Sequence, residues 1–283
     1  MLISFHEVAN LNYMNNTILD TRPRDLKKQF AQEYSDHLGL DFLATHDRIL
    51  SYGYEEYNST FFKELTERWY DLLESKGLEE AYSVYGDPYY FVDVIHCFLN
   101  YSRLYLRSLR RPSMADGRSF LETTEDAKVI VDIGCGIGYS TIALKEFYPN
   151  AKVYGINLRD TDQWKFCTAM GKKHGFEMVG DITEIPERVD VIFASEYFEH
   201  ICDPITHVQD IVAGVNPKYF VIANAFNTWS IGHFLKYAVK QPMGIQEIPQ
   251  AKISRAFNNE LRRVGYEKLK TTFFNSKPNI WYK

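Results

Sequence analysis

The stretch Val-Ile-Val-Asp-Ile-Gly-Cys-Gly-Ile-Gly-Tyr-Ser-Thr-Ile-Ala-Leu, residues 129–144, decides the fold. Its first five residues are mostly β-branched and apolar, as expected of a strand in a parallel sheet that is covered on both faces, and Asp132 is the exception. Gly134, Gly136 and Gly138 then remove side chains where a ligand must lie against the backbone. The stretch therefore predicts a strand, a ligand-binding loop and a helix in direct succession.

The glycine spacing separates two classes of ligand. A dinucleotide-binding loop has the pattern G-x-G-x-x-G, because pyrophosphate lies at the N-terminus of the helix. Here the third glycine comes one position early, at Gly138, and Tyr139 stands where that glycine would be. The carboxylate of Asp132 would also repel a pyrophosphate, whereas it suits a ligand with a cationic amino group. The pattern therefore disfavours a nicotinamide oxidoreductase.

At these residues the chain resembles the class I S-adenosylmethionine-dependent methyltransferases, whose first motif is a strand, an acid and G-x-G-x-G. The resemblance covers about residues 125–283 and implies an α/β, Rossmann-like fold. Its seven-stranded, mostly parallel sheet is flanked by helices, and strand seven is antiparallel. The resemblance implies that Asp132 holds the methionine amino group of the cofactor. The glycine loop that would accommodate the amino-acid and ribose portions contains Gly134, Cys135, Gly136 and Gly138.

The expected second strand, residues 152–156, ends at Asn157 and Leu158. In the resembled family this strand usually ends in Asp or Glu, which accepts hydrogen bonds from both ribose hydroxyls. The amide of Asn157 can still accept and donate, so ribose recognition is expected without the charge. Asp160 or Asp162 is an alternative partner for the ribose.

Two later strand ends follow in the order that the resemblance implies. Asp181, just past an expected strand at residues 177–179, and the amide of Ile182 would bind adenine as acceptor and donor, although Gly-Asp is also ordinary turn chemistry. The expected fourth strand, residues 189–194, leads into Ser195, which is assigned to the cofactor site.

The segment Ser195-Glu196-Tyr197-Phe198-Glu199-His200-Ile201 is expected to lie beside the sulfonium and the acceptor. Glu196 and His200 are four residues apart, so on a helix they would share a face. His200 is the candidate general base, Glu196 is expected near the cofactor, and Tyr197 in the substrate pocket. A purely structural His200 is the alternative. His200 and His207 lack further ligands, so no metal site is predicted.

A long aromatic segment after the expected fifth strand, residues 219–223, suits a cap over the substrate. It runs from Asn224 to Gly244. Asn224, Asn227 and Trp229 are candidate pocket residues, and His233 is a further catalytic candidate, although an ordinary surface helix would also explain His233. The chain is expected to end in a helix capped at Ser254 and strands at residues 269–274 and 279–282.

The N-terminal half lies outside the resemblance and is expected to be helical. Amphipathic patterns place Leu26, Phe30 and Tyr34 on one face, and Leu65 and Trp69 on another. A third helix is expected from Asp87 to before Pro112. Residues 1–125 therefore form a predicted substrate cap, and residues 126–283 a predicted S-adenosylmethionine-binding domain.

Composition limits the possible partners. The net charge of −5 provides no basic field for a phosphate backbone, so nucleic acid is not expected. The aromatic share of 15% indicates either bulky core packing or a stacking-rich pocket. The four cysteines have no ligand spacing, and no stretch is long enough to span a membrane, so a cytoplasmic protein is expected. A homo-oligomer remains open.

The sequence thus predicts methyl transfer from S-adenosylmethionine to an O, N or C atom of a small molecule, with S-adenosylhomocysteine as product. Within the family, the resemblance is to small-molecule methyltransferases of the quinone-biosynthesis type. The alternatives are a methyltransferase acting on protein or RNA and a non-catalytic, cofactor-binding regulatory module.

Overall fold

A seven-stranded sheet forms the centre of the protein in the computed structural model, which describes residues 18–41, 60–87, 90, 101–273 and 277–283. The strand order is β3-β2-β1-β4-β5-β9-β8. The strands are β1 (Val129–Ile133), β2 (Lys152–Ile156), β3 (Glu177–Val179), β4 (Val191–Ser195), β5 (Tyr219–Ala223), β8 (Glu267–Lys268) and β9 (Asn279–Tyr282). β9 pairs antiparallel with both β5 and β8, and the other pairings of this sheet are parallel. The predicted α/β architecture with an antiparallel last strand is confirmed.

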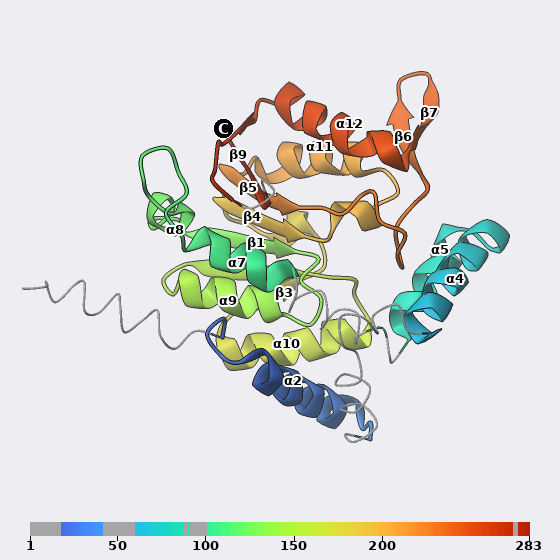
Figure 1. Ribbon diagram of the computed structural model, residues 1–283, viewed down its shortest axis with the longest axis horizontal. Coiled ribbons are helices and arrows are strands. Elements are labelled where there is room, and N and C mark those ends of the chain that lie inside the picture. The colour runs from blue at the N-terminus through green and yellow to red at the C-terminus, as the bar shows by residue number, and fades with distance from the viewer. Residues whose placement is uncertain (1–17, 42–59, 88–89, 91–100, 274–276) are drawn as a thin grey trace, which may run out of the picture.

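The two faces of the sheet carry separate hydrophobic cores, because every residue of β1 is buried and its side chains alternate between the faces. Figure 1 shows α9 and α10 on one face, and α11 and α12 on the other. These helices are α9 (Tyr139–Phe147), α10 (Asp162–His174), α11 (Pro204–Val215) and α12 (Gln250–Arg263). The carboxyl ends of β1, β2 and β4 meet at one edge, where a fold of this kind binds its ligand.

The described N-terminal helices pack on both sides of this core. They are α2 (Pro23–Leu38), α4 (Thr60–Ser75), α5 (Leu78–Ala81), the 3₁₀ helix η1 (Tyr82–Gly86), α7 (Arg103–Leu109) and α8 (Phe120–Thr123). Leu26, Phe30 and Tyr34 of α2 are buried in the core that contains α9 and α10, and Leu65 and Trp69 of α4 in the other. Both amphipathic predictions are therefore confirmed. The first part of the third predicted helix, residues 88–89 and 91–100, lies outside the described residues.

The segment predicted as a cap, residues 224–244, leads into a β-hairpin. Strands β6 (Lys236–Gln241) and β7 (Gly244–Pro249) pair antiparallel. Tyr237 and Val239 of β6 are buried, whereas Lys236 and Lys240 are exposed, which is the alternation of a half-buried strand. His233 lies outside any helix and is 3% exposed, so the alternative of an ordinary surface helix at this residue is wrong.

Two further boundaries differ from expectation. Helix α12 begins at Gln250, after Pro249 as N-cap, four residues before the predicted cap at Ser254. The expected strand at residues 269–274 is shifted, since β8 comprises Glu267 and Lys268 alone. Two 3₁₀ helices, η3 (Ile182–Glu184) and η4 (Phe198–His200), follow β3 and β4. In the described part of the chain, no helix combines the length and apolarity needed to cross a membrane.

Candidate functional site

A cavity of about 250 Å³ opens at the carboxyl edge of the sheet. One wall consists of the glycine loop after β1 and the ends of β2 and β4. The opposite wall comes from the N-terminal region. The lining includes Gly134, Cys135, Gly136, Asn157, Leu158, Ser195, Glu196, Tyr197 and His200 from the predicted site, and Tyr82, Tyr85, Tyr90 and Ser102 from the opposite wall.

The glycine loop is closely packed from behind. Gly134 has φ of 74°, and a Cβ atom there would lie 2.4 Å from Cδ2 of Tyr197. Gly138 has φ of 85°, and its Cβ would lie 2.7 Å from Sγ of Cys167. The amides of Gly134 and Cys135 donate to the carbonyl of Ile156, which fixes the loop to the end of β2. Gly138 is the one glycine of the loop that does not line the cavity.

Asp132 lies beneath the loop and does not line the cavity. Its Oδ2 accepts hydrogen bonds from the hydroxyls of Ser140 at 2.6 Å and Thr141 at 2.7 Å. Burial raises the pKa of Asp132 to about 6, although these two hydrogen bonds favour the charged form. The carboxylate therefore ties β1 to the first turn of α9. The expectation of direct contact with a cofactor amino group is not supported by this geometry.

Asn157 and Leu158 do line the cavity, as predicted. Nδ2 of Asn157 donates to the carbonyl of Gly136 at 2.9 Å, and Oδ1 accepts from the amide of Leu158 at 2.8 Å. These bonds orient the side chain against the glycine loop. An amide oxygen has two lone pairs, so Oδ1 retains one acceptor position for a ribose hydroxyl.

Asp181 and Ile182 lie outside the lining, whereas Gly180 is part of it. Oδ1 of Asp181 accepts from the amide and hydroxyl of Thr183, which caps η3 and lowers the pKa of Asp181. Ile182 is buried in the core beside α11. The turn interpretation of Gly-Asp therefore describes this position better than direct adenine binding.

Glu196 and His200 both reach the cavity, but not from a shared helical face. Glu196 has φ of 52°, in the left-handed region, and only residues 198–200 are helical, as η4. The chain therefore turns sharply after β4 and directs both side chains to the cavity. The hydroxyl of Tyr197 hydrogen-bonds with Nε2 of His207 at 2.9 Å, so His207 serves Tyr197 and not His200.

His200 is held by two tyrosines of η1. The hydroxyl of Tyr85 hydrogen-bonds with Nδ1 of His200 at 2.9 Å, and the hydroxyl of Tyr82 donates to the backbone carbonyl of His200 at 3.0 Å. Burial lowers the pKa of His200 well below its ordinary value, with His233 contributing. The imidazole is therefore neutral near pH 7 and can accept a proton or bind a metal ion.

Tyr82, Tyr85 and Tyr90 form the wall of the cavity opposite the glycine loop, here called the tyrosine wall. None of these residues was predicted. Tyr82 and Tyr85 stack at 5.8 Å, and Tyr85 meets the edge of Tyr90 at 4.8 Å. The hydroxyls of Ser102 and Ser195, which both line the cavity, are 3.0 Å apart. The high aromatic share was the only signal of such a wall, because it allowed a stacking-rich pocket without locating it.

The remaining predicted pocket residues lie elsewhere. Asn227 and Trp229 are exposed, and Trp229 stacks on Tyr70 of α4 with ring centres 5.9 Å apart. The backbone carbonyl of Asn224 accepts from Lys277. His233 lies behind His200, with ring centres 4.8 Å apart. None of these four lines the cavity formed by the described residues.

Comparison with known proteins agrees with this architecture. Residues 124–252 match the family model described as "Methyltransferase domain". The sheet order and the glycine loop agree with the class I fold predicted from the sequence. The domain boundary predicted at residue 126 and the quinone-biosynthesis subtype stay predictions.

Curated relatives match within a short segment. The tRNA U34 carboxymethyltransferase of Campylobacter jejuni is 33% identical over 94 residues, which are 31% of this chain and 32% of that protein. Trans-aconitate 2-methyltransferase of Rhodopseudomonas palustris is 30% identical over 95 residues, which are 33% of this chain and 36% of that protein. The chain thus spans about a third of the length of the curated relatives it matches.

Solved structures are more distant. A putative O-methyltransferase from Nostoc punctiforme has 12% identity and a TM-score of 0.46, covering 84% of this chain and 72% of its own. A SAM-dependent methyltransferase from Aquifex aeolicus has 16% identity and a TM-score of 0.39, covering 58% and 86%.

Proposed function

We propose that this protein transfers a methyl group from S-adenosylmethionine to a small-molecule acceptor. The observation that carries the proposal is the cavity, which has the glycine loop on one side and the tyrosine wall on the other. The first wall offers backbone and amide groups to the cofactor. The second offers aromatic faces, hydroxyls and His200 to an acceptor.

The expected chemistry needs little from the protein beyond alignment. Methyl transfer from a sulfonium is an in-line displacement, and the positive charge on sulfur already activates the methyl group. Alignment and exclusion of water supply up to about 7–11 kcal/mol in well-oriented reactions. His200 borders the cavity and is the group that prepares the acceptor, while Glu196 lies on the same turn. Whether O, N or C receives the methyl group depends on the acceptor.

Residues 1–125 serve, in this proposal, as the cap over the acceptor. Two hydrogen bonds support this role, because each joins the N-terminal region to the segment that carries a histidine. Nε1 of Trp69 donates to the backbone carbonyl of His233 at 2.9 Å, and Tyr82 donates to that of His200. Displacing α4 or η1 would therefore disturb both histidines.

An RNA acceptor is the second candidate, since some relatives are named as tRNA enzymes. The net charge of −5 argues against it, because RNA binding depends on neutralising phosphates with basic side chains. A protein acceptor and a non-catalytic regulatory module are weaker alternatives. A bound cofactor without transfer to any acceptor would favour the module.

The test begins with calorimetric titration of the full chain with S-adenosylhomocysteine and, separately, with NAD. We expect saturable binding of S-adenosylhomocysteine and none of NAD; tight binding of NAD alone would overturn the proposal. Methyl-labelled S-adenosylmethionine is then supplied with fractionated small metabolites, total tRNA or total protein. Label in a metabolite fraction supports the proposal. Label confined to tRNA or to protein would show that the acceptor is that macromolecule and not a small molecule.

A further inference from the structure

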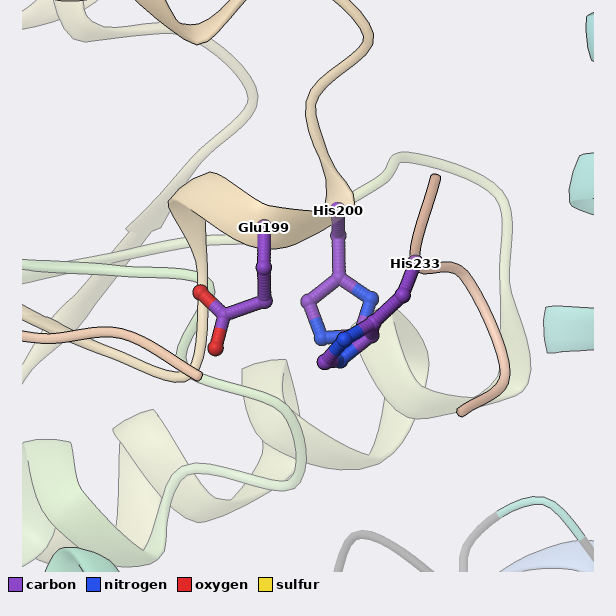
Figure 2. A group of neighbouring side chains, drawn as sticks. All are labelled: Glu199, His200 and His233. Atoms are coloured by element: carbon purple, nitrogen blue, oxygen red, sulfur yellow. The ribbon is translucent and has the colours of Figure 1, made fainter. Parts of the chain in front are cut away.

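Glu199, His200 and His233 converge behind the cavity. Figure 2 shows Glu199 and His200 extending from the same short helix, η4, while His233 approaches from a separate segment and its ring crosses that of His200. One ligand-type atom from each side chain lies within 4.8 Å of the other two. Within the described part of the chain, this is the one group of three such side chains close enough to share an ion.

Glu199 and His200 each have one side-chain atom anchored by a protein group. Oε1 of Glu199 accepts from the amide of Ala225 at 2.6 Å, and Nδ1 of His200 hydrogen-bonds with the hydroxyl of Tyr85. His233 is held through its backbone carbonyl, which accepts from Nε1 of Trp69 at 2.9 Å. Metal-binding side chains are held in this way, with one atom fixed by an outer partner and the other directed at the ion.

The unusual feature is the remaining polar atom of Glu199 and of His233. Oε2 of Glu199 and Nδ1 of His233 are buried and have no hydrogen-bond partner among the described residues. Glu199 is 0% exposed and His233 is 3% exposed, so water cannot easily satisfy these atoms. A buried polar atom without a partner destabilises the fold by about 1–3 kcal/mol. Two such atoms beside His200 indicate that something binds between them.

We propose that Glu199, His200 and His233 bind a divalent transition-metal ion of the zinc class. Two imidazoles and one carboxylate form the donor set of catalytic zinc sites, which keep a fourth position open. His200 lines the cavity, so the open position faces the acceptor side. With an ion bound, His200 acts on the acceptor as a ligand of that ion and not as a free base. This role towards the acceptor rests on the proposed function, whereas the binding of the ion does not.

The arrangement of the two rings favours an ion, because their centres lie 4.8 Å apart and both have a nitrogen close to the carboxylate of Glu199. If Nδ1 of His200 donates to Tyr85, its Nε2 keeps a lone pair for the ion. Donor atoms around zinc lie about 3.3 Å apart, so side-chain shifts of about 1–1.5 Å would close the site.

Other groups could instead compensate Glu199. Burial raises the pKa of Glu199. Hydrogen bonds from the backbone amides of Glu199 and Ala225, the side chain of Glu196 and the charge of Lys277 oppose that shift. A proton shared between Glu196 and Glu199 would leave Nδ1 of His233 without a partner. An ion satisfies both orphaned atoms at once, and for this reason we favour it.

The test is zinc binding to the full chain, purified without a histidine tag and stripped with a chelator. Equilibrium dialysis with ZnCl₂ and elemental analysis should give one tightly bound ion per chain. Glu199→Gln and His233→Gln remove one ligand each, and each should weaken zinc binding by at least about 100-fold, since even outer-sphere changes cost about 10–100-fold. Circular dichroism confirms that the stripped variants are folded.

The matched control is His174→Gln. His174 also has a buried nitrogen without a partner among the described residues, but it lies at the end of α10, away from the cluster. It should bind zinc like the wild type. A second control, Cys167→Ala, tests the thiol pair, because Sγ of Cys167 lies 3.7 Å from Sγ of Cys135.

No stoichiometric zinc in the wild type overturns the proposal, as does equal affinity in the wild type and both ligand variants. Zinc lost only in Cys167→Ala would place the ion at the thiols and also overturn it. S-adenosylhomocysteine binding is measured in parallel on the same samples. Its failure would count against the proposed function and leave the metal result standing.

Discussion

The two walls of the cavity are built by different means. The glycine-loop wall consists of backbone and of strand ends that adjoin in one sheet, and its contacts are fixed by β1, β2 and β4. The tyrosine wall consists of side chains from η1 that meet His200 across 115 and 118 residues of sequence. The first wall has the features of a general cofactor site, whereas the second places aromatic rings against the buried imidazole of His200. Changes to the first should therefore act on binding, and changes to the second on turnover.

His200→Ala should test this division between binding and turnover most clearly. Loss of a group that prepares the acceptor lowers the rate by about 10²–10⁴-fold. The S-adenosylhomocysteine dissociation constant should stay within about twofold, because a twofold change is less than about 0.5 kcal/mol and the glycine-loop wall is unaltered. Single-turnover rates and calorimetry measure the two quantities, and His174→Gln is the control. An unchanged rate would remove His200 from the mechanism.

Gly134→Ala should give the converse result. The new Cβ would overlap Tyr197, and φ of 74° is strained for alanine. Local strain of about 1–3 kcal/mol should weaken S-adenosylhomocysteine binding by about 10–100-fold, if the loop must move to relieve it. Gly214→Ala is the control, since a Cβ at this helical position meets no atom within 4 Å. Equal affinity in the wild type and Gly134→Ala would contradict the close approach assigned to this loop.

Asp132, which is buried beneath the glycine-loop wall, should make the stability of the protein depend on pH. Burial raises the pKa of Asp132 to about 6, so its charged form destabilises the native state. The neutral carboxyl group of Asp132 stabilises the native state fully below the pKa that Asp132 has in the unfolded chain. This stabilisation is lost as the pH rises through about 6. The wild-type free energy of unfolding should fall by about 2 kcal/mol relative to Asp132→Asn between about pH 4.5 and about pH 7.5.

Urea unfolding at several pH values measures this difference. Because the amide that replaces the carboxyl group in Asp132→Asn does not titrate, the variant provides the reference curve, and other titrating groups cancel in the comparison. A pH-independent difference between the two proteins would show that Asp132 has an ordinary pKa.

The two walls also differ in how far sequence could predict them. The bounds of β1, β2, β3, β5 and β9 follow from local runs of apolar residues and turn signals, and the structure has them at the predicted residues. The glycine loop directly follows β1 and Asn157 directly follows β2, so their place at the cavity was predictable. The cofactor contacts of Asp132 and Asp181 stay predictions, and in the structure short-range hydroxyl and amide donors bind their carboxylates.

The hairpin and the tyrosine wall escaped prediction for different reasons. Residues 236–241 do alternate between buried and exposed, but the preceding aromatic run obscured that period. The approach of Tyr85 to His200 has no local signature, since it depends on how α4, α5 and η1 pack against the sheet. Long-range packing of this kind cannot be read from spacing along one chain.

Tyr85→Phe should have a smaller effect than the loss of His200 itself. It removes the hydroxyl that orients the imidazole but keeps the ring contacts with Tyr82 and Tyr90. A net hydrogen bond contributes about 0.5–1.5 kcal/mol, so turnover should fall by about 2- to 10-fold. Steady-state kinetics with unchanged S-adenosylhomocysteine affinity would place the effect on the tyrosine wall. A fall as large as that of His200→Ala would mean that the hydroxyl itself takes part in the reaction.

Trp229→Ala should alter activity least, because Trp229 belongs to neither wall. The side chain is 47% exposed and stacks on Tyr70 with nearly parallel rings. Removing such an aromatic pair costs about 0.5–1.5 kcal/mol, which should appear in the free energy of unfolding. The Michaelis constants for both substrates should stay within about twofold, a change of less than about 0.5 kcal/mol. A Michaelis constant for the acceptor raised tenfold, with that for the cofactor unchanged, would extend the acceptor wall beyond the cavity to α4 and the segment after β5.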